Sequence, residues 1–338
     1  MIPTKRLQQG AVKIVNEGGE HMSISTPVLL LLFNRPDTTA KVFESIKKVK
    51  PKNLYVAADG PRKYKDGETD LCEKVRNIID EGIDWDCRVT KLYREENLGC
   101  GIAVSSAITW FFEHVEEGII LEDDTEPDIS FFTYCENLLS HYRHSDQIMH
   151  ISGDNFAPHV KLNCSYFFTR LPFIWGWATW RRAWNKYDFG YKHIPADQQM
   201  KILKKVFIDD EIIEYLSSIL QDFHLKPLSY TWDYQWFLSI WDNNGLVIQP
   251  VKNLVQNIGY GKDATHTVDE GDHLSTIKAE RITKIVHAGR PVVNQKLQKK
   301  NFRIYFKGQH ERSYKQILYR LLKINSVKNL MKKLVPDF

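Results

Sequence analysis

Three consecutive acids, Glu122, Asp123 and Asp124, follow the apolar run GIIL. Carboxylates are the ligands that Mg²⁺ and Mn²⁺ prefer, and such ions often take only one or two of them from the protein. A solvated acidic turn is the alternative, because the chain contains 42 acidic residues. Asp209 and Asp210 illustrate it, since they open an amphipathic helix, where first-turn acids favour the helix dipole. The three acids instead end a predicted strand, which favours a metal and ligand site.

The elements that position these acids alternate between short apolar runs and amphipathic segments of helical length. Strands are predicted near 27–34, 53–58, 88–93 and 118–122, with helices near 38–49, 70–79 and 102–117. This order predicts an α/β fold with a mostly parallel central sheet flanked by helices. Asn34, Asp59 and Asn97 follow strands, as the three acids do. Because ligands bind outside the carboxyl ends of such strands, the sequence predicts a nucleotide cleft there.

Four segments carry a resemblance to a known family: FNRP, VAADGPR, REENLGCGIAVSSAI and GIILEDDTEPDISFF. Together they resemble the donor half of bacterial GT-A fold glycosyltransferases related to the N-acetylglucosaminyltransferase I type. The similarity has specific motifs over about residues 27–140 and continues more weakly to about residue 267. It implies the Rossmann-like GT-A fold of nucleotide-diphospho-sugar transferases and a hexosyltransferase activity with a UDP-sugar donor.

In this resemblance the EDD run occupies the position of the family's DxD motif. The resemblance implies that Asp124 binds the divalent metal, Mn²⁺ or Mg²⁺, and that Asp123 contacts the ribose or the metal. It places Glu122 beside the donor sugar. Asn34 and Arg35 match the loop after the first strand, which holds the nucleotide.

Two further donor-binding segments have plainer alternatives. Asp59 matches the acid that reads uracil in the resemblance, although Asp-Gly-Pro is also ordinary turn composition. Asn97 and Gly99 begin a glycine-bearing loop whose backbone N–H groups are expected to face the donor phosphates or sugar. The alternative is a loop that only starts a helix.

A base is needed to deprotonate the acceptor hydroxyl in an inverting transfer. Asp233, near the start of a predicted aromatic helix, is the first candidate and is similar in placement to the base of related families. Its alternative role is that of a favourable acid in the first helical turn. Asp154, in the SGDN run after a strand, is the competing base or an acceptor-binding residue.

His266 is predicted to complete the metal site. It lies in the run GKDATHT, and many enzymes resembling this one supply a His or an acid from a C-terminal loop. The alternative is a structural or exposed histidine. The tryptophans of WGWATWRRAW are expected to pack in the core, or else to form an acceptor platform with Arg181 and Arg182.

Three segments are predicted along the chain. Residues 1–25 form an N-terminal extension expected to be poorly ordered, and residues 26–300 form the transferase domain, with a donor half at about 27–140 and an acceptor half at about 141–300. Residues 301–338 read as a basic amphipathic tail suited to an anionic membrane surface or to the protein's own body. With no apolar leader and five cysteines outside metal spacing, we expect a cytoplasmic protein, peripheral at the inner membrane face.

The expected partners are a nucleotide-sugar donor and a glycan or lipid-linked acceptor in surface polysaccharide biosynthesis, and no nucleic acid. A nucleotidyltransferase that forms sugar nucleotides is the competing enzyme class. FNRP after the first strand, in place of a GxGTR-like signature, disfavours it. The third reading is a non-catalytic sugar-binding protein of the same fold, which the retained EDD run disfavours.

Overall fold

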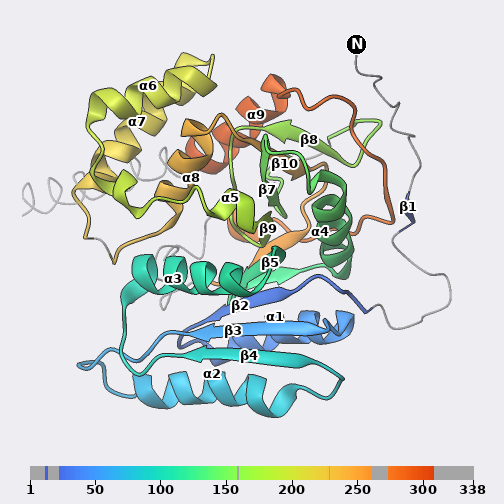
Figure 1. Cartoon of the computed structure of the whole chain (residues 1–338), viewed down its shortest axis with the longest axis vertical. Helices are drawn as coiled ribbons and strands as arrows, with labels where there is room; N and C mark the ends of the chain where they lie inside the picture. The colour runs from blue at the N-terminus through green and yellow to red at the C-terminus, as the bar shows by residue number, and fades with distance from the viewer. Residues whose placement is uncertain (1–11, 14–22, 158–159, 228, 261–272, 308–338) are drawn as a thin grey trace, which may run out of the picture.

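The computed structural model describes residues 12–13, 23–157, 160–227, 229–260 and 273–307 (Figure 1). An eight-stranded sheet runs through the described chain, in the order β4-β3-β2-β5-β9-β7-β10-β8. In its first half the elements are β2 (Val28–Leu32), α1 (Pro36–Val49), β3 (Asn53–Ala58), α2 (Glu68–Gly82), β4 (Arg88–Tyr93), α3 (Gly99–His114), β5 (Glu117–Glu122), β6 (Thr125–Pro127) and α4 (Ile129–Tyr142). Strand β1 (Val12–Lys13) pairs separately with β12 (Lys284–Ile285).

The first half of the sheet is parallel. From β2 the chain adds β3 and then β4 on one side, and α3 carries it back so that β5 pairs with the other side of β2. The strand order therefore reverses between β2 and β5. In an open α/β sheet such a reversal opens a crevice at the carboxyl ends of the two strands, which is where ligands bind.

The second half completes the sheet with β7 (Ile148–Ser152), β8 (Tyr166–Thr169), β9 (Trp177–Trp180) and β10 (Leu246–Pro250). Strand β9 runs antiparallel between β5 and β7, β10 is parallel to β7, and β8 closes the edge antiparallel. Its other elements are α5 (Arg181–Trp184), α6 (Ala196–Val206), α7 (Asp210–His224), α8 (Asp233–Asp242), β11 (Val255–Asn257), α9 (Gln295–Phe302) and a π-helical turn at Arg303–Lys307. Short 3₁₀ turns lie at Phe189–His193 and His273–Thr276. The predicted fold class, α/β with a mostly parallel central sheet flanked by helices, is confirmed.

Helices cover both faces of this sheet. Helix α1 contacts α2 and α4, whereas α3 contacts α5. Because crossovers are right-handed, the reversal of strand order after β4 sends α3 to the face opposite α1 and α2. Four apolar residues on one side of the first helix, Val42, Phe43, Ile46 and Val49, are all buried.

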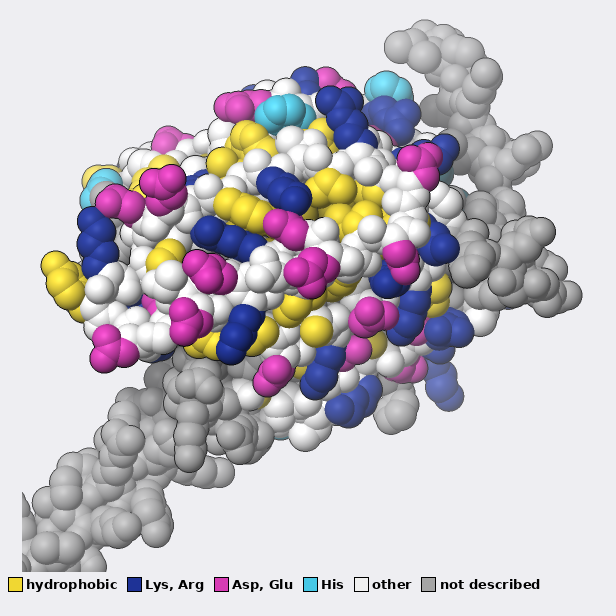
Figure 2. Space-filling model, turned by 90° about the horizontal axis from the view of Figure 1, so that it is seen from below, with side chains coloured by type: hydrophobic (Ala, Val, Ile, Leu, Met, Phe, Trp, Pro, Cys, Tyr) yellow, Lys and Arg dark blue, Asp and Glu magenta, His cyan; other side chains and the backbone are white. Residues whose placement is uncertain are grey.

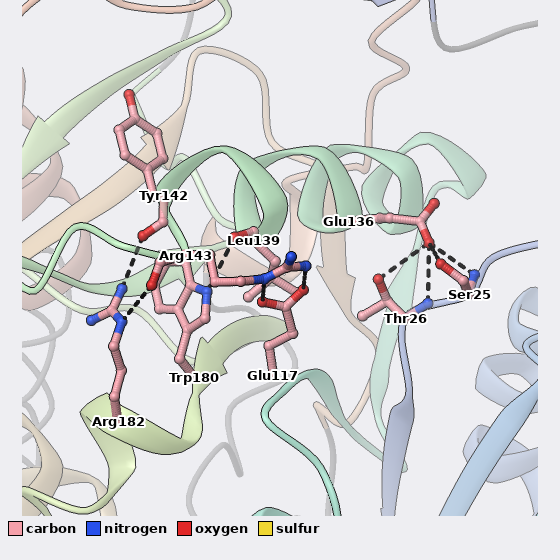
Figure 3. A network of polar contacts seen from close by, with 9 residues as sticks. All are labelled: Ser25, Thr26, Glu117, Glu136, Leu139, Tyr142, Arg143, Trp180 and Arg182. Atoms are coloured by element: carbon pink, nitrogen blue, oxygen red, sulfur yellow. Dashed lines mark hydrogen bonds and ion pairs between the residues drawn. The ribbon is translucent and has the colours of Figure 1, made fainter.

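Polar contacts fix α4 against the sheet (Figure 3). The carboxylate of Glu136 accepts hydrogen bonds from the backbone N–H groups of Ser25 and Thr26, at 2.8 and 3.1 Å. Just beyond the helix, Arg143 forms an ion pair of 2.6 Å with Glu117 at the amino end of β5. These contacts fix the position of β5 relative to α4. They therefore also fix the position of the turn at the other end of the strand.

Aromatic side chains fill the core of the second half. The ring of Trp177 stacks with two others. Its centroid lies 5.6 Å from that of Trp232 and 4.9 Å from that of His150. Burial holds the pKa of His150 down, at about 3, so that the ring is neutral. The tryptophans of the WGWATWRRAW run are all buried, as core packing predicts: Trp175, Trp177, Trp180 and Trp184.

The arginines of that run are part of the framework. Arg181 pairs with Glu116 and donates to the carbonyl oxygens of Phe112 and Val115. Arg182 donates to the carbonyl oxygens of Tyr142 and Arg143 (Figure 3) and to that of Ile148, each at 3.0 Å. Their guanidinium groups therefore stabilise the backbone, and the alternative role in meeting an anionic acceptor is not supported.

Several predicted boundaries shift. Helix α3 begins at Gly99, three residues before the prediction, and ends at His114. Ile24 is 2% exposed and hydrogen-bonds through its backbone to Val49 and Lys52, so the packed chain begins before residue 26. Helix α9 and the turn after it cross the predicted boundary at residue 300, with Phe302 and Phe306 buried. The tail from residue 308 and the loop that carries His266 lie outside the described residues.

Charges of both signs are interspersed on the face of the molecule seen from below, where α2 and the edge strand β4 lie (Figures 1 and 2). Strand β4 places Lys91 against Asp80 of α2, with 2.7 Å between the charged atoms.

None of the helices in the described part of the chain has the length and apolar character that a membrane crossing requires.

Candidate active site

The acids predicted from the sequence form the turn at the carboxyl end of β5. Glu122 ends the strand, and its backbone N–H donates to the hydroxyl of Thr125 at 3.0 Å. Asp123 and Asp124 make the turn into β6 and are only 3% and 7% exposed. They are therefore not a solvated acidic turn, in contrast to Asp209, whose carboxylate caps α7 by accepting from the backbone of Glu211.

Arg35 joins the two buried aspartates. It follows β2 at the start of α1, and its Nη2 lies 2.7 Å from Asp123 Oδ1 while its Nη1 lies 2.9 Å from Asp124 Oδ2. The backbone N–H of Phe33 also donates to Asp123, at 3.2 Å. Because β2 and β5 are neighbours where the strand order reverses, the predicted nucleotide loop and the predicted metal acids meet in one place.

The carboxyl end of β5 carries surplus negative charge. Burial raises the pKa of Glu122, and the nearby charges of Asp124 and Asp123 raise it further, against the opposing effect of Arg35. Burial likewise raises the pKa of Asp123, although Arg35 opposes the shift. Among the described residues, the guanidinium of Arg35 faces all three carboxylates, so additional positive charge would be favourable here.

Gly259 lies directly against this ion pair. The backbone N–H of Ile258 donates to the carbonyl oxygen of Asp124 at 2.8 Å, which holds the end of β11 over the turn. A Cβ atom on Gly259 would lie 2.2 Å from Asp124 Oδ2 and 2.7 Å from Arg35 Nη1. Only glycine permits this approach, and the sequence offered no signal for it.

Asp59, after β3, organises the loop before α3. Its carboxylate accepts from the backbone N–H groups of Gly60, Leu98 and Gly99 at 3.0–3.2 Å, and from the side-chain amide of Asn97 at 3.0 Å. The amide of Asn97 also donates to the carbonyl oxygen of Gly60, at 2.9 Å. The predicted donor-binding residues Asp59, Asn97 and Gly99 are thus brought together, and they hold one another in position.

The start of α3 is closed by a second contact. Gly99 has a φ of +75°, and a Cβ there would lie 2.8 Å from Cβ of Ser229. The carbonyl oxygen of Ser229 accepts from the backbone N–H of Gly101 at 2.9 Å. The backbone donors that the sequence suggested for phosphates are therefore used inside the protein, by Asp59 and by Ser229.

A buried acid that sequence reasoning missed supports Asn34. Glu68 has no exposed surface and accepts from the Asn34 amide at 2.8 Å and from the backbone N–H of Arg62 at 2.8 Å. Burial alone would raise its pKa, but its hydrogen bonds from Arg62, and the Arg62 charge, lower the pKa to about 2. Arg62 also lies over the Phe33 ring, at 5.4 Å. The only available signal was the arginine that ends VAADGPR.

Asp233 comes to the same site from the second half of the chain. It is the first residue of α8, and its Oδ1 accepts from the Thr231 hydroxyl at 2.5 Å and from the backbone N–H of Tyr234 at 2.9 Å. Asp233 lies close enough to Glu122 to raise the pKa of that carboxyl. Cys100 is close to both carboxyls: burial raises the pKa of its thiol, and the charges of Glu122 and Asp233 raise it further.

Asp154, the competing base, is enclosed. It lies two residues beyond β7 and has no exposed surface, and its Oδ2 accepts from the backbone N–H of Trp175 at 3.0 Å. Its Oδ1 has no hydrogen-bond partner among the described residues. Burial raises its pKa well above the usual range, against the hydrogen bond from the backbone of Trp175.

In the described part of the chain, no group of three or more His, Cys, Asp or Glu side chains could hold a metal ion. Asp123 and Asp124 offer carboxylate oxygens at a site with surplus negative charge, which suits a hard divalent cation. Such an ion keeps waters and substrate phosphates as its other ligands, so two protein carboxylates are sufficient. His266 lies outside the described residues.

Comparison with known proteins yields structural similarities only. No protein-family model matches the chain, and no curated protein matches its sequence. Among solved structures it is similar to S. aureus TarS 1-349 (13% identity, 70% of this chain and 61% of that chain, TM-score 0.38). It is also similar to HddC from Yersinia pseudotuberculosis (12%, 46% and 77%, 0.29) and to UDP-glucose pyrophosphorylase complexed with UDP-glucose (10%, 43% and 63%, 0.26). Similarities of this extent establish no family.

Proposed function

We propose that the chain is a metal-dependent, inverting glycosyltransferase that moves a sugar from a UDP-sugar donor to a hydroxyl of a glycan or lipid-linked acceptor. One observation carries this proposal: three groups lie close together where the strand order of the sheet reverses. Arg35 follows β2, the acids follow β5, and Asp233 approaches from α8. The resemblance of the FNRP and EDD segments supplies the chemistry, and surface polysaccharide biosynthesis is the expected setting.

Asp124 and Asp123 would hold the cation, Mn²⁺ or Mg²⁺. When bound, the ion neutralises charge on the departing diphosphate as a Lewis acid. The protein's own part is to present two carboxylates on a rigid turn, which β6 and the end of β11 hold in place. Arg35 adds a fixed positive charge beside them, and the loop held by Asp59 and Glu68 shapes the nucleotide side of the site.

Asp233 is the proposed base. Its partial exposure and its proximity to Glu122 let it face a donor held at the acids, whereas Asp154 is fully buried. The hydrogen bonds from Thr231 and Tyr234 hold Oδ1 and orient the carboxylate. In this arrangement Asp233 accepts the proton of the acceptor hydroxyl as that oxygen attacks the anomeric carbon.

The proposal is tested by incubating the protein with a panel of nucleotide sugars and measuring release of UDP or GDP with and without Mn²⁺. We expect Mn²⁺-dependent release of UDP from one donor, and thermal stabilisation by UDP with Mn²⁺. Pyrophosphate release from a nucleoside triphosphate and a sugar phosphate would instead identify a nucleotidyltransferase. Stabilisation by UDP without any turnover would identify a non-catalytic binding protein.

The base is tested by Asp233→Asn. We expect transfer to fall by roughly a hundredfold or more, as loss of a general base does, with UDP binding retained. Asp242→Asn is the matched control, because Asp242 ends the same helix and accepts from the hydroxyl of Tyr191. Transfer that survives in Asp233→Asn would move the base to another residue.

A further inference from the structure

Arg35 occupies the side of the aspartate pair where the proposed function requires a divalent ion. Its two terminal nitrogens each contact a different carboxylate, at 2.7 Å to Asp123 and 2.9 Å to Asp124. A guanidinium is always protonated, so the pair already holds one positive charge in this structure. A cation that binds both carboxylates must therefore displace at least one of these contacts.

We propose that Arg35 is an exchangeable internal cation: it neutralises Asp123 and Asp124 in the free protein and yields them to the divalent ion when the donor binds. The inference rests on the proposed function and assigns Arg35 a positioning role within it. After the exchange, the guanidinium carries its charge to the donor diphosphate, whose negative charge arrives together with the ion. The two binding events become coupled through one side chain.

The geometry allows the side chain to move while its backbone stays in place. The carbonyl oxygen of Arg35 accepts from the N–H and the hydroxyl of Thr39, at 3.0 and 2.7 Å, which fixes the backbone at the start of α1. The Arg35 side chain is 22% exposed, against 4% and 11% for its two partners. The carboxylates are held on a buried turn, so the guanidinium is the mobile member of the cluster.

Charge explains the direction of the exchange. Asp123 and Asp124 lie in one buried turn, and among the described residues both form their ion pair with Arg35. A divalent ion neutralises both aspartates, whereas one guanidinium neutralises half of that charge. Without the donor, however, repulsion between the released guanidinium and the ion opposes binding of the ion. The ion should therefore bind weakly to the free protein and more tightly with a nucleotide diphosphate, and the coupling must be reciprocal.

The test measures Mn²⁺ binding directly, by electron paramagnetic resonance of free Mn²⁺ and by calorimetry, with and without UDP. Arg35→Gln removes the charge, and we expect it to bind Mn²⁺ alone at least tenfold more tightly than the wild type. The gain in Mn²⁺ affinity that UDP brings to the wild type should be largely lost in this variant. Arg35→Lys, which keeps a charge without the two-point contact, should fall between the two.

Arg143→Gln is the matched control, because it removes an arginine that pairs with Glu117 at the other end of the same strand. It should leave Mn²⁺ binding unchanged. Equal Mn²⁺ affinity in wild type, Arg35→Gln and Arg35→Lys would overturn the exchange, and the proposed function would stand if Asp124→Asn still abolished Mn²⁺ binding with UDP. Absence of Asp124-dependent Mn²⁺ binding in every protein, with UDP present, would overturn the metal-dependent function itself.

Discussion

The two ends of β5 carry acids in opposite circumstances. At the amino end, Glu117 pairs with Arg143 (Figure 3) and Glu116 pairs with Arg181. The side chains of Arg143 and Arg181 are 51% and 31% exposed. At the carboxyl end, three carboxylates share Arg35 within a buried turn. One strand thus begins in balanced surface charge and ends in unbalanced buried charge.

The difference separates a structural use of acids from a functional one. Exposed ion pairs contribute about 0–1 kcal/mol each, and balanced pairs need no ligand. Buried carboxylates without matching cations are unfavourable, and strongly perturbed pKa values of this kind cluster at functional sites. A bound cation would therefore balance the excess negative charge at the carboxyl end of β5.

The sharpest test of this comparison is Asp124→Asn against Glu117→Gln, which neutralise one acid at each end. We expect Asp124→Asn to lower Mn²⁺-dependent UDP release by several kcal/mol of transition-state stabilisation, roughly a thousandfold in rate. Glu117→Gln should leave the rate unchanged and lower the free energy of unfolding by about 1 kcal/mol or less. Steady-state kinetics and urea denaturation measure both effects. Equal rates in the two variants would remove the distinction between the ends of the strand.

Gly259 offers a test of how closely the carboxyl end is packed. Gly259→Ala places a methyl group 2.2 Å from Asp124 Oδ2 and should destabilise the protein by about 1–3 kcal/mol, as overpacking does. It should also weaken UDP binding, because the Arg35–Asp124 contact must shift. Gly289→Ala is the control, since a Cβ there meets nothing within 4 Å among the described residues. A Gly259→Ala protein with wild-type stability and UDP affinity would show that the turn is loosely packed.

The smallest expected effect is a change in how stability depends on pH. The raised pKa of Glu122 means that the folded, metal-free protein binds more protons than the unfolded chain above the ordinary glutamate pKa of about 4.3. Its contribution to stability is therefore complete below that pH and is lost as pH rises through the raised pKa. Glu122→Gln should flatten this decline in denaturation series with a chelator present. An unchanged slope, with Glu117→Gln as reference, would show that Glu122 is ionised at neutral pH.

Local patterns allowed much of the fold to be predicted. Apolar runs and helical periodicity placed β2, β3, β4 and β5 with the helices between them. Element ends were less certain, as the early start of α3 shows, because Asp59 and Ser229 hold that start from distant parts of the chain. Such contacts leave no periodic signal.

By itself the sequence determined that acids follow the fourth strand of a parallel sheet, because hydrophobic periodicity and polarity are properties of residues that are neighbours in the chain. It also distinguished Glu122–Asp124 from the acids at Asp209 and Asp210, because a predicted strand precedes the former and a helix follows the latter. Only the tertiary structure decided that Arg35 pairs with Asp123 across 88 positions, that Asp233 approaches Glu122, and that Asp154 is enclosed. The physical reason is strand order. These contacts depend on β5 lying beside β2, and the packing of the whole core determines which strands are neighbours.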